Sequence, residues 1–204
     1  MKQKLFFATG NRGKVEELEN LVKDMALDVE ILTLADFPDF TPPPETGTTF
    51  RENALIKARS ACDATGLPAL ADDSGLAVDA LAGAPGVYSA RYSGEGATAE
   101  ANNEKLLLAM EGVPDGERTA HFFAVLCLAL PDGSNAFSEG RVDGKILRNY
   151  QGNQGFGYDP LFFVPELGRG MAEMTMAEKN SISHRSRAFQ GLRNALNSCF
   201  SQKA

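Results

Sequence analysis

A glycine-containing turn near the N-terminus places the strongest constraint on how this chain folds. The apolar run Leu5–Phe7 leads directly into Ala8–Lys14, which reads ATGNRGK. Beyond this turn, apolar residues recur every three or four positions, which is typical of one face of a helix. The residues between them, Glu16, Glu17 and Glu19, are expected to face solvent. The segment therefore predicts a β-strand, a tight turn and an α-helix in succession.

The same turn is typical of a backbone site for phosphate. Gly10 and Gly13 allow the backbone to approach a ligand closely, and the free amides at a helix start favour an anion. The helix dipole disfavours Lys14 in the first turn by about 0.3 to 1 kcal/mol, so an anion is expected nearby. A Walker A loop has four residues between its glycines and a Ser or Thr after its lysine, and this run has neither. The alternative is an ordinary strand-to-helix turn with a surface lysine.

Charge and hydropathy exclude several classes of partner. The chain of 204 residues has a net charge of -7 at pH 7, whereas surfaces that bind nucleic acid or anionic membranes are basic. No apolar run approaches the ~20 residues that span a bilayer, and the N-terminus does not resemble a secretory signal. We therefore expect a cytoplasmic protein without a nucleic-acid or membrane partner. Since no linker interrupts the sequence, one domain over residues 1–204 is expected.

Alternation of strand and helix patterns predicts an α/β protein with a mixed sheet. Strands are expected at residues 28–34, 67–71, 119–130, 136–147 and 160–165, and a turn at residues 131–134 makes the third and fourth an antiparallel hairpin. Helices are expected from Thr49 to Gly66, at residues 99–110, and at the C-terminus. Thr49 and Glu52 form a capping box, which makes Glu52 structural. The last helix carries Ala188, Leu192, Ala195 and Leu196 on one face.

Three acidic residues are candidates for chemistry. Asp72 and Asp73 follow the short strand at 67–71, a position where α/β proteins often present catalytic groups. Adjacent carboxylates repel each other unless a cation is near. Glu45 ends a proline-rich segment, and with one aspartate it could share a hard cation such as Mg²⁺. The alternatives are an Asx-type turn for the aspartates and a solvated loop position for Glu45.

A second candidate segment is Gly155-Phe156-Gly157-Tyr158-Asp159. Because glycines flank Phe156, a planar ring could reach its face, and a stacked base contributes roughly 1 to 3 kcal/mol in single-strand binding proteins. Asp159 is expected to recognise the edge of such a base. The alternative is a glycine-rich turn with one or both aromatic rings in the core.

The third candidate segment precedes the last helix, with Ser181 or Ser183 as its expected cap. Lys179, His184 and Arg185 gather at a helix end whose dipole disfavours cations, which again predicts an anionic ligand. The other histidine, at position 121, lies inside an expected strand and is interpreted as packed.

Taken together, these segments resemble the inosine triphosphate pyrophosphatase family, also known as the Ham1-like or non-standard purine nucleoside triphosphate pyrophosphatases. The matching segments are ATGNRGK (8–14), PETG (44–47), FRENA (50–54), ADDSGLAVDAL (71–81), GAPGVYSARY (83–92), GFGYDPLFF (155–163) and SHR (183–185). The resemblance implies a two-lobed α/β fold in which helices flank a long mixed central sheet, with a cleft between the lobes. It also implies a homodimer and Mg²⁺-dependent hydrolysis of ITP, dITP and XTP to the monophosphate and pyrophosphate.

The resemblance further implies residue roles. Asp73 would be the general base and, with Glu45, a magnesium ligand. The substrate-binding residues would be Thr9, Gly10, Asn11, Arg12, Gly13, Lys14, Ser74, Phe156, Gly157, Tyr158, Asp159, Lys179, His184 and Arg185. Two rival interpretations are a Maf-like pyrophosphatase and a catalytically silent nucleotide-binding protein. The TGNRGK and SHR segments argue against the first, and the acidic residues beside a polyphosphate site argue against the second.

Overall fold

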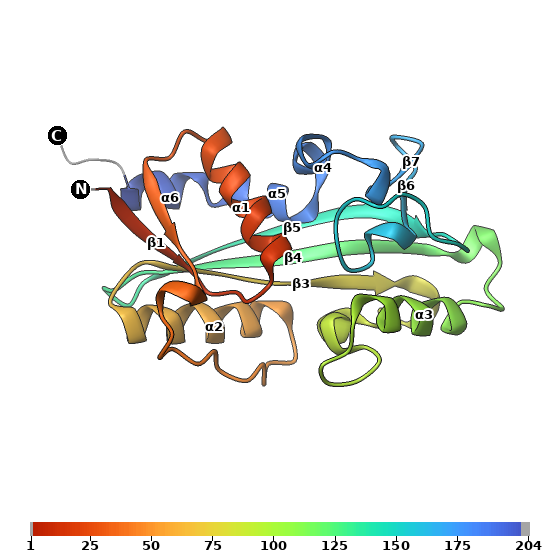
Figure 1. The fold of residues 1–204 in the computed structure, drawn as a ribbon, viewed down its shortest axis with the longest axis horizontal. Coiled ribbons are helices and arrows are strands. Elements are labelled where there is room, and N and C mark those ends of the chain that lie inside the picture. The colour runs from red at the N-terminus through yellow and green to blue at the C-terminus, as the bar shows by residue number, and fades with distance from the viewer. Residues whose placement is uncertain (1, 201–204) are drawn as a thin grey trace. The chain divides into compact units, whose positions relative to one another are not determined.

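A computed structural model describes residues 2–200, where seven strands form one sheet in the order β2-β1-β3-β4-β5-β6-β7 (Figure 1). Strand β1 (Gln3–Phe7) is parallel to β2 (Val29–Leu32) and to β3 (Ala69–Val78). Next come β4 (Thr119–Ala129) and β5 (Asn135–Ile146), and the short turn between them makes an antiparallel hairpin. Strand β6 (Phe162–Val164) is antiparallel to β5 and to β7 (Arg169–Gly170). The predicted mixed sheet is confirmed.

The α-helices are α1 (Arg12–Asp24), α2 (Phe50–Thr65), α3 (Ala99–Ala109), α4 (Met176–Ile182), α5 (His184–Gly191) and α6 (Arg193–Phe200). Across residues 2–200, no helix combines the length and the apolarity needed to cross a bilayer. The chain divides into two compact units. Unit 1 is Met1–Asp73, Ala124–Gly140 and Arg185–Ala204, and unit 2 is Ser74–Phe123 and Arg141–His184.

The alternation of side chains along β1 builds the core of unit 1 on two faces. Leu5 and Phe7 point to one face, where they join one buried cluster with apolar residues of α1, α5 and α6. Phe6 points to the other face, and its ring centroid lies 4.6 Å from that of Phe37. Figure 1 shows α1 and α6 on one side of the unit 1 strands and α2 on the other.

Helix α2 begins as the sequence predicts. The Thr49 side chain accepts a hydrogen bond from the backbone of Glu52, and the Glu52 side chain accepts one from the backbone of Thr49. The helix ends at Gly66, which adopts a left-handed conformation with φ of 68°. The capping box is therefore confirmed, and it fixes where the side chains of α2 point.

In unit 2, the guanidinium of Arg118 binds main-chain carbonyls without solvent around it. Arg118 is 3% exposed, and its nitrogens donate to Ile146 O at 2.8 Å, Met110 O at 2.7 Å and Leu147 O at 3.0 Å. Arg118 therefore supplies hydrogen-bond donors to main-chain carbonyls at the C-terminal ends of α3 and β5.

The Arg118→Met substitution is expected to lower the free energy of unfolding by about 2 to 4 kcal/mol, because it leaves several buried carbonyls without donors. Urea denaturation measures this change. The matched control is Arg148→Met, because the Arg148 side chain is 50% exposed and its loss should cost much less. Equal losses for the two variants would contradict the structural role of Arg118.

Three sequence-based boundaries are wrong. Strand β3 does not end before Asp72; it runs unbroken from Ala69 to Val78. The expected strand at 160–165 is a 3₁₀ turn, Asp159–Leu161, followed by the short β6. The last helix, expected after a cap at Ser181 or Ser183, is divided into α5 and α6, and the short helix α4 before it was not expected. At Gly191, the last residue of α5, a Cβ atom would lie 2.0 Å from Ser138 Oγ, so any side chain there would have to displace Ser138.

Candidate active site

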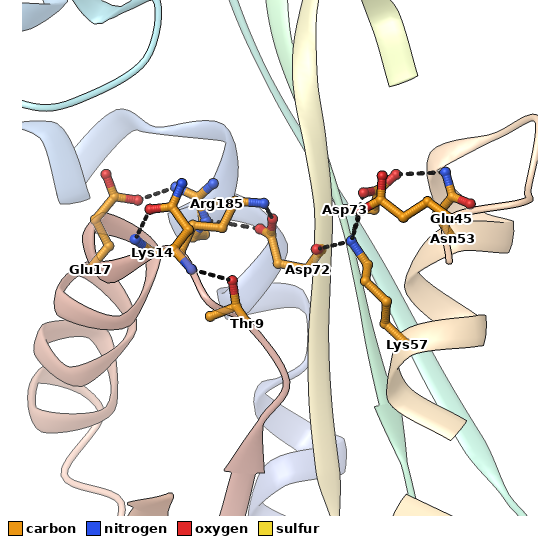
Figure 2. Close-up of polar contacts among 10 residues, drawn as sticks. Thr9, Lys14, Glu17, Glu45, Asn53, Lys57, Asp72, Asp73 and Arg185 are labelled. Atoms are coloured by element: carbon orange, nitrogen blue, oxygen red, sulfur yellow. Dashed lines mark hydrogen bonds and ion pairs between the residues drawn. The ribbon is translucent and has the colours of Figure 1, made fainter. Parts of the chain in front are cut away.

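The two adjacent aspartates of β3 lie on opposite faces of the strand. Successive side chains of a strand alternate, and in Figure 2 Asp72 points toward α1 whereas Asp73 points toward α2. They therefore do not form the mutually repelling pair that the sequence suggested. Each carboxylate has its own cationic partners within unit 1.

Asp72 joins a buried ionic network. Its Oδ2 accepts from Arg185 Nε at 2.8 Å, and its Oδ1 pairs with Lys14 Nζ. Arg185 also pairs with Glu17, and the side chains of Arg185, Glu17 and Asp72 are at most 2% exposed. Burial alone would lower the pKa of Arg185, but the Asp72 and Glu17 carboxylates raise it above its usual value.

One sequence-based interpretation of this region is wrong. Glu17 was expected to face solvent, yet it is fully buried beside Arg185. An anion was expected near Lys14, and in this structure the Asp72 carboxylate lies there; a phosphate ligand at the turn stays a prediction. Burial lowers the pKa of Lys14, and Asp72 opposes that shift only in part.

The predicted phosphate turn adopts the expected strand-turn-helix geometry. Helix α1 begins at Arg12, and the Asn11 side chain caps it by accepting from the backbone N–H of Lys14 at 3.2 Å. Thr9 Oγ1 accepts from the backbone N–H of Asn11, also at 3.2 Å. Gly10, Asn11 and Arg12 are exposed, whereas Thr9, Gly13 and Lys14 are partly buried. The turn thus presents backbone and side-chain donors at a helix start, where anions bind well.

On the other face of β3, Asp73 is held by two residues of α2. Lys57 Nζ lies 2.7 Å from Asp73 Oδ1, and Asn53 Nδ2 lies 3.3 Å from Asp73 Oδ2. Lys57 Nζ also lies 3.1 Å from Glu45 Oε1 and donates to the main-chain carbonyl of Asp72 at 2.8 Å. The predicted pair Glu45 and Asp73 therefore converges on one positive charge.

The protonation of this cluster follows from its burial. Burial raises the pKa of Asp73, and the Lys57 ammonium lowers it only in part. For Lys57 the burial acts in the opposite direction, but the Asp73 and Glu45 carboxylates outweigh it and raise the pKa. A carboxylate whose pKa is raised toward the working pH suits a general base.

Asn53 and Lys57 were missed as candidates, as was Glu17. A signal was present for the first two, because they are four residues apart on a helix and therefore lie on the same face. Asn53 and Lys57 could therefore have been singled out as polar residues on the buried side of a capped helix that faces the strand with Asp72 and Asp73. Glu17 carried no comparable signal, since it lies in a run of glutamates.

In unit 2, a second cluster surrounds Phe156. Asp159 is 3% exposed, and its Oδ2 accepts from the backbone N–H of Phe156 at 2.8 Å and from Lys179 Nζ at 2.6 Å. Lys179 Nζ also lies 4.5 Å from the centroid of the Phe156 ring. The structure thus brings three predicted substrate-binding residues together. Lys179 is in the last turn of α4, where the dipole favours a cation, so the expectation that it lies at a helix end whose dipole disfavours it is wrong.

The remaining predicted residues of unit 2 are mostly buried. The Tyr158 hydroxyl donates to Ser89 O at 2.8 Å, and this hydrogen bond holds the Tyr158 ring in place. His184 is 4% exposed and its ring stacks on Phe122 with centroids 4.9 Å apart. Gly155 has φ of 76°, and a Cβ atom there would lie 2.2 Å from the Asp159 carboxylate. Ser74 and Gly157 are partly buried.

No group of three or more His, Cys, Asp or Glu side chains among residues 2–200 forms a metal cage on its own. The Glu45 and Asp73 carboxylates nevertheless already share one cation, the Lys57 ammonium. Mg²⁺ is often held by one or two carboxylates together with substrate phosphates, so this donor set fits it.

The mixed sheet, the phosphate-type turn and the carboxylate–lysine cluster together make this an α/β protein with a candidate phosphate- and metal-binding site. The chain belongs to the Ham1 family, whose model matches residues 5–195. A relative from Desulforamulus reducens, a dITP/XTP pyrophosphatase, is 51% identical over 95% of this chain and 96% of its own length. Another dITP/XTP pyrophosphatase, from Geobacter sulfurreducens, is 53% identical over 95% and 96%. The solved structure of a HAM1 protein from Coxiella burnetii has a TM-score of 0.85 and 41% identity, covering 96% of this chain and 99% of that protein. The predicted family and fold class are confirmed.

Proposed function

We propose that this chain hydrolyses dITP, XTP and ITP to the nucleoside monophosphate and pyrophosphate. The observation that carries the proposal is the link between two clusters of unit 1. The Asp72 side chain binds Lys14 of the phosphate turn, and its main-chain carbonyl binds Lys57, which holds Glu45 and Asp73. Phosphate-binding and acidic groups thus meet at one residue of β3. The dITP/XTP pyrophosphatases, at about half identity over 95% of the chain, support dITP and XTP as substrates.

In the proposed reaction, the turn from Thr9 to Lys14 binds the triphosphate with its backbone N–H groups and the lysine ammonium. Asp73 takes a proton from a water molecule as the water oxygen bonds to the α-phosphorus. The bond from that phosphorus to the bridging oxygen breaks, and pyrophosphate leaves. Glu45 and Asp73 would hold Mg²⁺, which when bound supplies charge neutralisation for the phosphate oxygens.

The proposal assigns recognition of the base to the cluster around Phe156. Lys179 covers one face of the Phe156 ring, so a purine would stack on the other. A site built to hydrogen-bond a 6-oxo group leaves polar atoms unpaired against the 6-amino group of ATP, which can discriminate by up to ~10⁴. The proposal also includes the homodimer and the two lobes that the family resemblance implies, together with the cytoplasmic location and the single domain expected from the sequence.

Pyrophosphate release from dITP, XTP, ITP, GTP and ATP, with and without Mg²⁺, tests this function. Fast Mg²⁺-dependent release from dITP, XTP and ITP, with slow release from ATP, is expected. Orthophosphate as the product would contradict attack at the α-phosphorus. Tight nucleotide binding without hydrolysis of any of the five would instead favour a silent binding protein.

The Phe156→Ala substitution is expected to lower kcat/KM for dITP by about 5- to 100-fold, mainly through KM, because stacking of a base contributes roughly 1 to 3 kcal/mol. Steady-state kinetics measures this change. The matched control is Phe156→Tyr, which keeps the ring and should stay within about threefold of the wild type. An unchanged KM in Phe156→Ala would remove Phe156 from base recognition.

A further inference from the structure

Lys57 occupies the two carboxylates that the proposed function assigns to magnesium. Its Nζ lies 3.1 Å from Glu45 Oε1 and 2.7 Å from Asp73 Oδ1. The Lys57 side chain is only 11% exposed, so protein atoms rather than solvent surround most of it. A positive charge of the chain itself therefore lies where two acidic groups meet (Figure 2).

A divalent cation and the Lys57 ammonium cannot both use these oxygens at close range. Two cations that share the same carboxylates lie within a few ångströms of each other, and partly buried charges are poorly screened by salt. One lysine leaves the two carboxylates with an excess of one negative charge, so a dication that replaces it has a favourable charge balance. Binding of the cation thus requires Lys57 to withdraw from the carboxylates.

The surroundings of Lys57 provide for such a withdrawal. Its third acceptor is the main-chain carbonyl of Asp72, at 2.8 Å, which carries no net charge and remains available when the carboxylates bind a metal. Asp73 keeps a second anchor, because Asn53 Nδ2 donates to its other oxygen at 3.3 Å. Asn53 is itself fixed by accepting from the backbone N–H of Gly47 at 2.8 Å. The carboxylate can therefore keep its orientation while Lys57 changes partner.

We propose that Lys57 is an exchangeable counter-ion: it partly neutralises Glu45 and Asp73 in the metal-free protein, and a divalent cation displaces it. After displacement, Lys57 stays at the site through the Asp72 carbonyl, with its charge directed to a phosphate of the substrate. This inference rests on the proposed function, which makes Glu45 and Asp73 the metal ligands. It predicts that Lys57 opposes metal binding in the absence of nucleotide.

The test is the affinity of the full chain for Mn²⁺ alone, measured from the free Mn²⁺ signal in electron paramagnetic resonance without nucleotide. Lys57→Met should bind Mn²⁺ about fivefold or more tightly than the wild type, because the competing charge is gone. The matched control is Lys57→Arg, which keeps the charge and should stay within about threefold of the wild type. Equal Mn²⁺ affinity of Lys57→Met and wild type, or no measurable binding by either, would overturn the proposal.

A second measurement covers the case in which Lys57→Met folds poorly, since it leaves two carboxylates facing each other. Added Mn²⁺ should raise the Tm of Lys57→Met, or of the milder Lys57→Gln, more than that of the wild type. Equal shifts would also overturn the proposal. Adding Glu45→Gln to Lys57→Met should abolish the gain in affinity, which locates the ion.

The counter-ion role of Lys57 and the proposed pyrophosphatase function can fail independently in these experiments. If the wild type releases pyrophosphate from dITP but Lys57→Met gains no Mn²⁺ affinity, only the counter-ion role fails. If the wild type releases no pyrophosphate from any of the nucleotides, the proposed function fails whatever Lys57 does.

Discussion

Asp73→Asn is expected to lower kcat for pyrophosphate release from dITP by about 10²-fold or more, because an amide cannot accept the proton of the attacking water. The geometry around the residue should change little. The amide oxygen can still accept from Lys57, as Asp73 Oδ1 does at 2.7 Å. Steady-state kinetics at saturating substrate and Mg²⁺ measures the effect.

The fold should tolerate this change. Burial already raises the pKa of Asp73, so the environment does not strongly favour its charged form. The main loss is one hydrogen bond, because the new Nδ2 would face the donor of Asn53, at a cost of about 1 kcal/mol. Urea denaturation should therefore show a folded variant.

The control for this variant is Asp63→Asn, an exposed carboxylate on the same helix as Lys57, and its kcat should equal that of the wild type. A folded Asp73→Asn protein with near-normal kcat would show that Asp73 is not the general base.

Arg185→Met should cause the largest loss of stability among the substitutions considered, about 3 to 5 kcal/mol, because it leaves Glu17 and part of Asp72 as buried carboxylates without their cation. Neither acidic side chain is exposed to solvent. Urea or thermal denaturation measures the change.

A surface pair of the same type is the matched control. Arg169 Nη2 lies 2.8 Å from Glu178 Oε1, the same separation as between Arg185 Nε and Asp72 Oδ2, but the Arg169 and Glu178 side chains are each 43% exposed. Since water solvates an exposed pair, Arg169→Met should change stability far less. If the two variants lost equal stability, burial of the Arg185 network would not be what stabilises it.

Much of the local structure could be predicted because its signals lie within a few residues. The strand-turn-helix unit at Ala8–Lys14 and the capping box of Thr49 and Glu52 depend on backbone hydrogen bonds between near neighbours. The same holds for the hairpin turn at residues 131–134. The alternation of strand and helix patterns predicted the α/β class, the family resemblance added the two-lobed arrangement, and the roles of the site residues stay predictions.

Errors arose where the decisive partner is distant in sequence. Glu17 carries the same local signal as Glu16 and Glu19, yet Arg185, 168 residues away, buries it. Lys179 was assigned to the start of the last helix because the short helix α4, in whose last turn it lies, was not predicted. Pattern alone cannot distinguish a solvated charge from one that is paired across the fold.

The sequence by itself determined the α/β class, the principal turns and helix starts, and the acidic, cationic and aromatic groups available for chemistry, because periodicity and capping are local properties of the chain. Only the tertiary structure decided how those groups are paired. The continuous strand β3 sends Asp72 and Asp73 to opposite faces, with Lys14 and Arg185 on one side and Lys57 and Asn53 on the other. The two aspartates point to opposite faces because successive side chains of a strand alternate. This alternation applies to them only because β3 continues through both residues instead of ending before Asp72.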